Sequence, residues 1–474
     1  MNFDQQSSLL TFQIPATLAN SPDLITLQLK SVFVNISKNE IFRSSETIIV
    51  RNQPFINNYP YTQIFCVGDS FTTRWCRIRK ACLLNDNLIF SFPFNVTFED
   101  VFIIVGPKAP PHDDLKQRIH PDKIKILRRF PDVPFDDITT QLTARVGNNQ
   151  MIWHNIMDFV APTYWTMSSN LAGLTTNEWG SRNPLYGTID RSWRIMEYHE
   201  TYSWKIGIFY IKLLIDLPFE YLPTSTKCYE HINIGLRKTV IDPTRTVINE
   251  STPILCSYEI DPEGVKGLRE HMLNAIHVNG SRMPNIQRPI IMIIHRRGND
   301  LKRKIINIED VLNATKELCP LCDVQIVDFQ NRNKEKQVEF THNASLLIGM
   351  HGSGLTHGVW LNPSTQEMPT GIYELFPYRY NCRNWYHQMA DMVKIQYFAY
   401  YTKSINLSRF DTKLSNKTIS RCIMNKNNLC SIPQCHDVIR DQSAIIDIEE
   451  YKRIIEPYFK QINESMKLYF NQKI

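Results

Sequence analysis

The stretch Ser345-Leu-Leu-Ile-Gly-Met-His-Gly-Ser-Gly-Leu-Thr-His-Gly-Val-Trp-Leu361 decides the fold of the C-terminal half of this chain. Its apolar residues 346–350 predict a buried strand, and the run from Leu355 to Leu361 predicts a short helix. The turn between them, His351-Gly352-Ser353-Gly354, is rich in glycine, which lets the backbone approach a ligand closely. A strand, a glycine-rich turn and a helix point backbone N–H groups at an anion, so we predict a phosphate-binding turn. In the alternative interpretation, the glycines only permit tight packing.

A second apolar run, Gly371-Ile-Tyr-Glu-Leu-Phe376, follows this motif after Asn362-Pro363. We expect Glu374 near the end of the second strand, where ligands bind in open α/β sheets. A carboxylate beside a phosphate-binding turn could grip ribose hydroxyls, so the pair suggests a nucleotide or nucleotide-sugar site. In the alternative, Glu374 forms an interdomain salt bridge.

Strands alternate with helices around the motif, which is typical of a parallel, doubly wound sheet. We therefore predict a Rossmann-like domain over roughly residues 285–405. Asn307 is a plausible N-cap for its first helix, which has acids in its first turn. The predicted strands are 289–295, 324–328, 345–350, 371–376 and 396–401, and the predicted helices are 307–316, 334–343, 355–361 and 384–393.

The N-terminal half gives a weaker pattern. Its first part looks rich in strands, and residues 140–270 carry mixed α/β signals. At the other end, Asp447–Phe470 predicts a long amphipathic helix. We expect four parts in chain order: a β-rich segment over 1–110, an α/β domain over 111–275, a Rossmann-like domain with the predicted nucleotide-sugar site over 276–435, and a C-terminal helix over 436–474 that packs back on the N-terminal domain. The domain over 111–275 becomes the acceptor side under the family resemblance described below.

The composition excludes several classes of protein. A chain of 474 residues is too long for one ordinary core, and 21% charged with 43% hydrophobic residues is typical of a globular protein. The net charge of +6 is small, and no dense Lys/Arg block with interleaved aromatic residues occurs, so we expect no nucleic-acid partner. No apolar run approaches the roughly 18 residues of a membrane-spanning helix, so we expect no membrane span.

Cysteines and sequons indicate an oxidising, glycosylating lumen, either endoplasmic reticulum or Golgi. The chain has 11 cysteines, an odd number that leaves at least one unpaired within the chain. Cys319-Pro-Leu-Cys322 has no second CxxC or His pair nearby, so we expect a local disulfide or two buried thiols rather than a zinc site. No signal peptide or anchor is visible in the first twenty residues, and a truncated N-terminus is one explanation.

The Asn-X-Ser/Thr sequons are spread over the whole chain. A chain rich in Asn, Ser and Thr also forms sequons by chance. We expect Asn343, which lies directly before the buried strand, to remain unmodified. The sequons start at Asn35, Asn95, Asn249, Asn279, Asn313, Asn343, Asn406, Asn416 and Asn463.

The motifs resemble the signature of glycosyltransferase family 61. The most specific parts are Met350-His-Gly-Ser-Gly-Leu-Thr-His357 and Tyr373-Glu-Leu-Phe-Pro-Tyr378. Ile294-His-Arg-Arg297 and then Arg303-Lys-Ile-Ile-Asn-Ile-Glu309 are similar to the family's basic strand end and the element after it. The resemblance runs in patches over about residues 70–470, and its weaker patches include Cys228–Leu236 and His154–Asp158 followed by Pro162.

The resemblance implies a GT-B-like α/β fold, with two Rossmann-like domains facing a cleft, a β-rich N-terminal extension and a C-terminal helix. It implies an inverting transfer of GlcNAc from a UDP-sugar donor, UDP-GlcNAc, to an acceptor glycan or hydroxyl on a secretory-pathway glycoprotein. Segments such as Trp75–Cys82 resemble members that extend O-mannose, whereas Gly354–His357 resembles members that add O-GlcNAc to EGF repeats. Xylosyl or arabinosyl transfer and a nucleotide-sugar-binding pseudoenzyme are the alternatives.

The donor site that this resemblance implies is cationic. The N–H groups of the glycine-rich turn would stabilise the diphosphate leaving group as its charge develops. Arginine suits bidentate phosphate contacts, although one of the adjacent pair 296–297 could be merely solvated. His351 would face the diphosphate or act as a capping residue, and His357 reads as structural. The predicted donor-binding residues are Arg296, Arg297, Arg303, His351, Gly352, Ser353, Gly354 and Glu374.

The acceptor hydroxyl needs a base, which in a two-domain transferase should come from the N-terminal domain. His154 and Asp158 are spaced i, i+4 and would share one face of a helix, so one could be the base and the other its orienting partner. A helix cap or an interdomain salt bridge is the alternative, and Glu197 is a third candidate base. No Asp-X-Asp motif is convincingly placed, so we expect no cofactor and no metal requirement for donor binding.

Overall fold

The computed structural model forms two compact units. Unit 1 comprises residues 1–240 and 257–260, and unit 2 comprises residues 241–256 and 261–474. The residues that the structure describes are 2–3, 10–11, 31–35, 40–44, 60–67, 75–93, 96, 98, 101–105, 118–144, 152–164, 166–167, 193–198, 207–236, 262–278, 284–296, 302–381, 383–411, 413–424 and 432–471.

Unit 1 is built on a nine-stranded mixed sheet. Seven strands follow the order β10-β7-β6-β15-β12-β13-β14, while β11 pairs with β15 and β5 pairs with β6. Strands from before and after residue 110 therefore belong to one sheet. The strands are β5 (Gln63–Val67), β6 (Trp75–Leu84), β7 (Asn87–Ser91), β10 (Ile124–Leu127), β11 (Phe135–Asp136), β12 (Thr140–Thr143), β13 (Arg194–Glu197), β14 (Glu220–Tyr221) and β15 (Lys227–Ile234).

The centre of this sheet is an antiparallel pair, β6 with β15, joined by the Cys82–Cys228 disulfide. One face is apolar and packs Ile78, Leu142 and Ile232 into a buried cluster. β12 and β13 pair in parallel, and a helical segment lies between them in the chain, as a parallel connection requires. The helices of unit 1 are η2 (Pro121–Lys123), α2 (Ile152–Asn155), the π-helical turn η3 (Ile156–Val160) and α4 (Gly207–Leu214).

Three short antiparallel pairs accompany this sheet in the described N-terminal residues. They are β1 (Asn2–Phe3) with β2 (Leu10–Thr11), β3 (Ser31–Asn35) with β4 (Glu40–Ser44), and β8 (Ile103–Ile104) with β9 (Arg118–Ile119).

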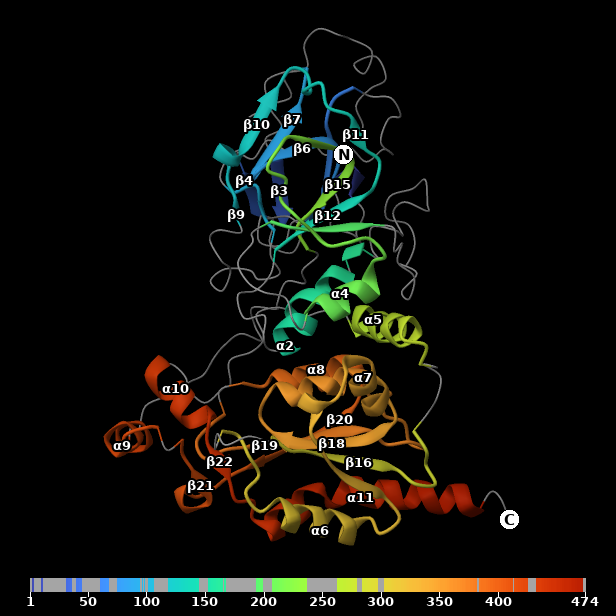
Figure 1. Cartoon of the computed structure of the whole chain (residues 1–474), viewed down its shortest axis with the longest axis vertical. Helices are drawn as coiled ribbons and strands as arrows, with labels where there is room; N and C mark the ends of the chain where they lie inside the picture. Colours follow the sequence, from blue (N-terminus) through green and yellow to red (C-terminus); the bar gives the residue numbers. More distant parts are fainter. Residues whose placement is uncertain are drawn as a thin grey trace. The chain divides into compact units, whose positions relative to one another are not determined.

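Unit 2 is a doubly wound α/β domain, as the alternating pattern predicts. Its five strands are all parallel in the order β17-β16-β18-β19-β20. Helices cover both faces of the sheet, with α7 and α8 on one face and α6 and α11 on the other (Figure 1). The strands are β16 (Ile290–Ile294), β17 (Asp323–Val327), β18 (Ala344–Met350), β19 (Gly371–Phe376) and β20 (Gln396–Tyr401). The α/β class and the parallel sheet are therefore confirmed.

The helices of unit 2 match the predicted ones with two corrections. The segment after the glycine-rich turn is a 3-10 helix that already begins at Ser353. Asn307 directly precedes the helix α6 (Ile308–Leu318), but its side chain forms hydrogen bonds with the backbone of Ile446 instead of capping that helix. The helices are α5 (Pro262–Ala275), α6 (Ile308–Leu318), η5 (Phe329–Asn331), α7 (Lys334–His342), η6 (Ser353–Trp360), α8 (Trp385–Val393), η7 (Ile405–Leu407), α9 (Asn416–Met424), α10 (Pro433–Arg440) and α11 (Ile448–Asn471).

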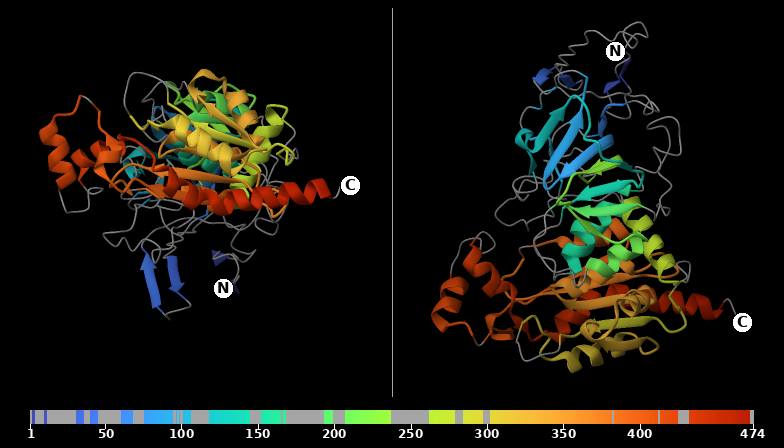
Figure 2. Two further views of the ribbon diagram at one scale, coloured as in Figure 1. Left: turned by 90° about the horizontal axis from the view of Figure 1, so that it is seen from below. Right: turned by 45° about the horizontal axis from the view of Figure 1, so that its top comes forward.

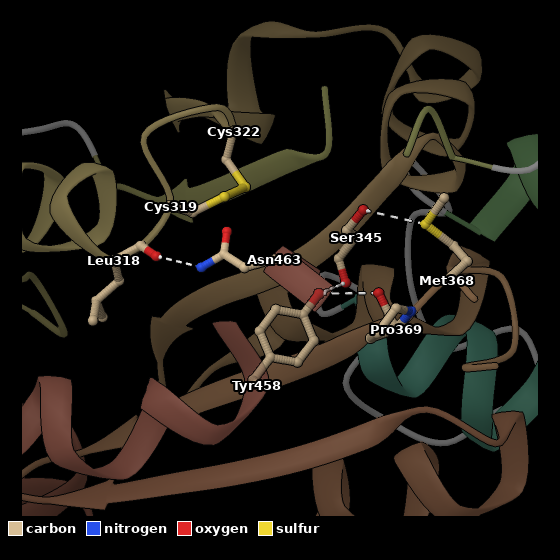
Figure 3. The surroundings of a disulfide bond; sticks show 8 residues. All are labelled: Leu318, Cys319, Cys322, Ser345, Met368, Pro369, Tyr458 and Asn463. Carbon is tan, nitrogen blue, oxygen red and sulfur yellow. Dashed lines mark hydrogen bonds between the residues drawn. A yellow bond between two sulfur atoms is a disulfide. The ribbon is translucent and has the colours of Figure 1, made fainter. Parts of the chain in front are cut away.

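The C-terminal helix α11 packs on the sheet of unit 2. Its buried side chains share one apolar cluster with Ile291, Leu346 and Leu375. Tyr458 donates to the carbonyl oxygens of Ser345 (2.8 Å) and Pro369 (3.1 Å), beside the Cys319–Cys322 disulfide (Figure 3). This corrects the expectation that the helix packs back on the N-terminal domain, because the sheet of its own unit buries its apolar face. Cys319 and Cys322 form the local disulfide, one of the two expected outcomes.

A smaller cluster closes one end of unit 2. The helices α9 and α10 are joined by the Cys422–Cys435 disulfide and pack with Phe376 and Tyr380. The helices α9 and α10 lie at one end of the sheet, and the C-terminal end of α11 lies at the other (Figure 2). The short strands β21 (Ser408–Arg409) and β22 (Ser443–Ala444) pair next to it. Among the helices that the structure describes, none has the length and apolar content that a membrane crossing requires.

Candidate functional site

The order of the strands in unit 2 selects one edge of the sheet for ligand binding. β16 comes first in the chain and has β17 on one side and β18 on the other. The direction of winding reverses between β16 and β18, and doubly wound domains bind ligands at the carboxyl ends of such strands. Arg296 follows β16 and the glycine-rich turn follows β18, so both predicted elements lie at this switch point.

Two arginines converge on Gly352. A Cβ atom placed on Gly352 would lie 3.2 Å from Nη2 of Arg296 and 3.2 Å from Nη1 of Arg303. Glycine therefore leaves room for both guanidinium groups, which a larger residue would crowd. Arg303 itself has a φ of 55°, in a region that non-glycine residues rarely adopt and that is enriched at functional sites.

Arg296 forms no ion pair within the described part of the chain, although the charge of Asp441 acts on it. Burial, with the charge of nearby Arg303, lowers the pKa of Arg296 to about 10, so the group is still cationic at neutral pH. Two neighbouring half-buried cations favour the binding of an anion between them. The first N–H groups of η6 add to the attraction, because a helix start leaves its first donors without intrahelical acceptors.

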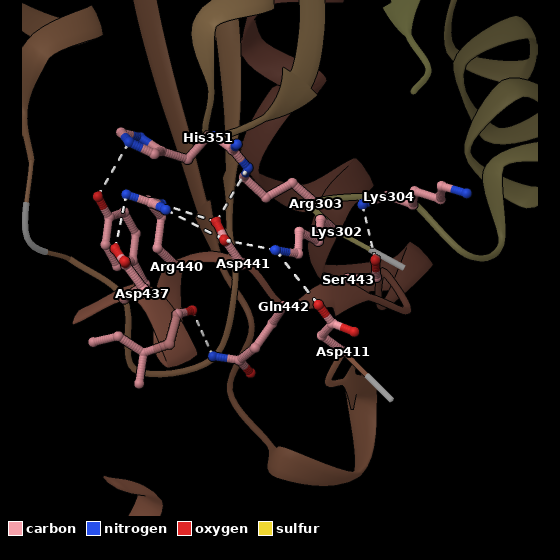
Figure 4. Close-up of polar contacts among 12 residues, drawn as sticks. Lys302, Arg303, Lys304, His351, Asp411, Asp437, Arg440, Asp441, Gln442 and Ser443 are labelled. Atoms are coloured by element: carbon pink, nitrogen blue, oxygen red, sulfur yellow. Dashed lines mark hydrogen bonds and ion pairs between the residues drawn. The ribbon is translucent and has the colours of Figure 1, made fainter. Parts of the chain in front are cut away.

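Asp441 forms an ion pair with Arg303 at its Nε atom, while the Nη1 atom of Arg303 lies near Gly352. Its carboxylate lies 3.5 Å from Nε of Arg303, 3.7 Å from Nζ of Lys302 and 2.9 Å from Nε of Arg440 (Figure 4). Burial opposes the ionisation of Asp441, but the hydrogen bond and charge of Arg440 hold the pKa of its carboxyl below its usual range. Lys302 also approaches Asp411 at 3.4 Å. Arg303 is thus anchored by an acid while its Nη1 end faces the glycine.

His351 and Glu374 are in direct contact beneath the turn. The Nδ1 atom of His351 lies 2.5 Å from Oε1 of Glu374, whose Oε2 accepts a hydrogen bond of 2.5 Å from Tyr397. The Nε2 atom of His351 lies 3.3 Å from the hydroxyl oxygen of Tyr380. The exposed fraction is 0% for Glu374 and 3% for His351.

This geometry changes the role of Glu374. A ribose contact needs an exposed carboxylate oxygen, whereas both oxygens of Glu374 are buried and engaged by protein side chains. Its partners are also not in another domain, since His351 directly follows β18 and Tyr397 lies on β20, the two strands that flank β19 in the same sheet. We therefore assign Glu374 to the support of His351.

The candidate base lies in unit 1. His154 and Asp158 occur on one continuous helical segment, but residues 156–160 form a π-helical turn rather than an α-helical one. His154 is partly buried, and Glu197 at the end of β13 is buried. Arg297 lies outside the described residues.

Sequence reasoning missed Asp441 and Tyr397. Asp441 is a single acid that follows α10, far along the chain from the arginine that it anchors, and no spacing rule connects the two. The sequence contained only a weak indication for Tyr397. Alternation along β20 places it on the same side of the strand as Ala399 and Tyr401, and so separates it from Tyr400.

His357 is structural, and its burial predicts a pH dependence. Its ring packs against Phe329 with a centroid distance of 4.1 Å and a tilt of 34°, and among the described residues its Nδ1 atom has no hydrogen-bond partner. Burial, with a smaller effect of Lys334, lowers the pKa of His357 to about 3. The unfolded chain binds this proton below about pH 6.5, so the free energy of unfolding rises with pH between about 3 and 6.5 and then levels off.

Through His357 alone, we expect the free energy of unfolding of unit 2 to be about 1 kcal/mol lower at pH 5.5 than at pH 7.5. Urea midpoints at both pH values should show that His357→Phe removes this part of the difference. His277→Gln, which changes an exposed histidine, should leave the difference unchanged. An unaltered pH dependence in His357→Phe would contradict the assignment.

Comparison with known proteins gives a family match over part of the chain. The family model "Glycosyltransferase 61" matches residues 152–368, which include the helix with His154 and the glycine-rich turn. This match, over slightly less than half of the chain, supports the family that the motifs resemble.

Curated relatives with sequence similarity are EGF domain-specific O-linked N-acetylglucosamine transferases. The Xenopus laevis protein is 30% identical over 139 residues, which are 28% of this chain and 24% of the relative. The Gallus gallus protein is 43% identical over 61 residues (12% and 11%), and the Drosophila melanogaster protein is 37% identical over 97 residues (20% and 17%). The similarity thus covers about a quarter or less of these relatives.

Proposed function

We propose that unit 2 of this glycosyltransferase binds the diphosphate of a UDP-sugar between Arg296, Arg303 and the Gly352–Gly354 turn. One observation carries the proposal: two guanidinium groups meet over a glycine at the switch point of the sheet, and Arg296 forms no ion pair among the described residues. A diphosphate would supply the missing anion. Arginine can bind phosphate oxygens in a bidentate manner.

The same groups suit the chemistry of transfer. When the bond between the sugar and the diphosphate breaks, negative charge grows on the leaving oxygen. The fixed guanidinium groups and the N–H groups of Gly352, Ser353 and Gly354 would stabilise that charge. In this proposal they do so without a metal ion.

Inversion at the sugar carbon requires a base that takes the proton of the acceptor hydroxyl. We propose His154 and Asp158 for this step, one as the base and the other as its orienting partner. Their support is the shared helical segment within the matched family region. The proposal includes a GT-B type of fold, in which the base and the donor site belong to different Rossmann-like domains.

For the donor we propose UDP-GlcNAc, and for the acceptor a hydroxyl on a secretory-pathway protein. The relatives are named as O-linked N-acetylglucosamine transferases specific for EGF domains, which favours an EGF-repeat hydroxyl as acceptor. An O-mannose glycan is the second candidate, because segments of the chain resemble members that extend O-mannose.

The test is turnover and donor competition. Protein expressed in the secretory pathway is offered UDP-GlcNAc or UDP-xylose with a folded EGF repeat or an O-mannosylated peptide, with and without EDTA. We expect GlcNAc transfer that UDP inhibits and EDTA does not. Transfer of xylose alone would replace the donor, loss of activity in EDTA would reject metal independence, and UDP binding without any turnover would indicate a pseudoenzyme.

A location in the lumen of the secretory pathway, which we propose, would allow N-glycans at exposed sequons. Asn313, Asn406 and Asn416 are exposed in unit 2 and can carry N-glycans. The side-chain nitrogen of Asn343 instead donates to the Glu339 carbonyl (2.9 Å), and that of Asn463 donates to the Leu318 carbonyl (3.1 Å). A glycan on either nitrogen would replace one of its two hydrogens and would have to fit beside this bond, so we expect neither asparagine to be modified.

We expect Asn→Gln at each of the three exposed sequons to increase gel mobility by one glycan. Asn343→Gln and Asn463→Gln serve as matched controls and should leave mobility unchanged. A protein made with a signal sequence that carries no glycan at Asn313, Asn406 or Asn416 would contradict the prediction.

A further inference from the structure

A chain of hydrogen bonds crosses three adjacent strands and ends at the glycine-rich turn. It runs from Tyr397 on β20 to Glu374 on β19 and on to His351, the residue after β18. Both contacts are 2.5 Å long, and that of Tyr397 lies within the range of charge-assisted O–H···O bonds. Of these residues, Tyr397 and Glu374 lie beyond the stretch that the family model matches.

The donor and acceptor roles along this chain follow from the chemistry of the groups. An ionised carboxylate only accepts hydrogen bonds, so Tyr397 must donate its hydroxyl hydrogen to Oε2. His351 must then carry a proton on Nδ1 and donate it to Oε1. A fully buried carboxylate is tolerated only when such partners satisfy it. The three residues therefore depend on one another.

The imidazole of His351 has little freedom to turn. It lies against the rings of Phe376 (centroid distance 5.5 Å), Tyr380 (4.8 Å) and Tyr386 (5.5 Å). Its backbone N–H also donates to the carbonyl of Leu375 at 2.9 Å. Both the main chain and the side chain of the residue before Gly352 are thus fixed, and Gly352 is the position over which Arg296 and Arg303 meet.

Tyr397 is itself held in place. Its ring stacks on His387 of α8 with a centroid distance of 4.5 Å and an interplanar angle of 11°. Burial and the charge of Glu374 both raise the pKa of Tyr397, so its hydroxyl stays protonated as a donor. The edge strand β20 thereby provides a fixed hydrogen bond to Glu374.

We propose that Tyr397 and Glu374 are positioning residues for donor binding. They hold His351, and through it the turn that would receive the diphosphate, and they do not touch the donor. The inference rests on the proposed function of the Arg296–Arg303–Gly352 site.

The same strand offers a matched control. Tyr400 is also buried in β20, but it lies on the opposite face, where its hydroxyl oxygen accepts from the N–H of Asp447 (3.0 Å). Tyr397→Phe and Tyr400→Phe each remove one hydroxyl, and only the first contacts Glu374. By calorimetry, we expect Tyr397→Phe to weaken UDP binding about tenfold and Tyr400→Phe less than twofold. Equal losses in both variants would overturn the inference.

A double-mutant cycle tests whether the residues act as a unit. Glu374→Gln should weaken UDP binding at least as much as Tyr397→Phe, and the double variant should bind no more weakly than Glu374→Gln alone. Additive losses would show that Tyr397 does not act through Glu374 and would overturn the inference.

NMR of ¹⁵N-histidine-labelled protein examines His351 without any ligand, and His351→Gln identifies its signal. We expect a proton on Nδ1 of His351 in the wild type and a changed signal in Glu374→Gln. An Nδ1 atom without a proton would overturn the inference even if UDP binds. A protonated Nδ1 in a protein that binds no UDP would instead overturn the proposed donor site, and with it the positioning role.

Discussion

Replacing Arg296 by alanine should weaken UDP binding by about 100-fold, which corresponds to about 2.7 kcal/mol. The guanidinium is half-buried beside Gly352, and it forms no ion pair with an acid among the described residues. The bound diphosphate would therefore lose a partly desolvated, charge-assisted contact rather than a screened surface contact. Arg296→Lys should restore only part of the affinity, because an ammonium group cannot form a bidentate contact. Isothermal titration with UDP measures both variants.

Arg288 provides the control for this substitution. It precedes the same strand, β16, at the amino end of the sheet, and its side chain is 70% exposed beside Asp323. Arg288→Ala should leave UDP affinity within twofold of the wild type. If Arg296→Ala and Arg288→Ala bind UDP equally, the anion site does not lie at the carboxyl ends of β16 and β18.

Replacing Tyr458 by alanine should lower the free energy of unfolding by about 3–5 kcal/mol. Its ring is fully buried between α11 and the sheet, and its hydroxyl donates to two buried carbonyl oxygens. The substitution leaves a cavity and removes the hydroxyl that both carbonyl oxygens accept from. Urea denaturation followed by a signal from unit 2 measures the effect.

Leu468 lies on the same helix and is 60% exposed. Leu468→Ala should change the same transition by less than about 0.5 kcal/mol. A Tyr458→Ala variant as stable as Leu468→Ala would mean that α11 is not part of the core of unit 2.

The fold of unit 2 was predictable because each strand is a short apolar run bounded by polar residues. The predicted strand 371–376 coincides with β19, and 396–401 coincides with β20. The partner of α11 was not predictable in this way. Its apolar stripe shows that one face is buried but carries no information on which sheet buries it.

The candidate site was predictable where it depends on the backbone. A basic residue after β16 and glycines after β18 must meet if the two strands are neighbours, and they do. The role of Glu374 was not predictable, because it depends on side-chain contacts across strands. An acid on a strand can bind a ligand or a buried histidine, and only the position of Tyr397 and His351 distinguishes the two.

The anchoring of Arg303 shows the same limit. Asp441 reaches this arginine from the segment that follows α10, which a disulfide joins to α9. Such a contact depends on how the end of unit 2 folds over the sheet. Periodicity and motif spacing describe local structure and give no access to it.

The crystal structure of this chain with UDP would test the donor-site proposal most directly. We predict diphosphate oxygens within hydrogen-bond distance of Arg296, Arg303 and the N–H groups of the Gly352–Gly354 turn. Glu374 should still be hydrogen-bonded to His351 and Tyr397. UDP bound elsewhere, or a diphosphate that contacts neither arginine, would contradict it.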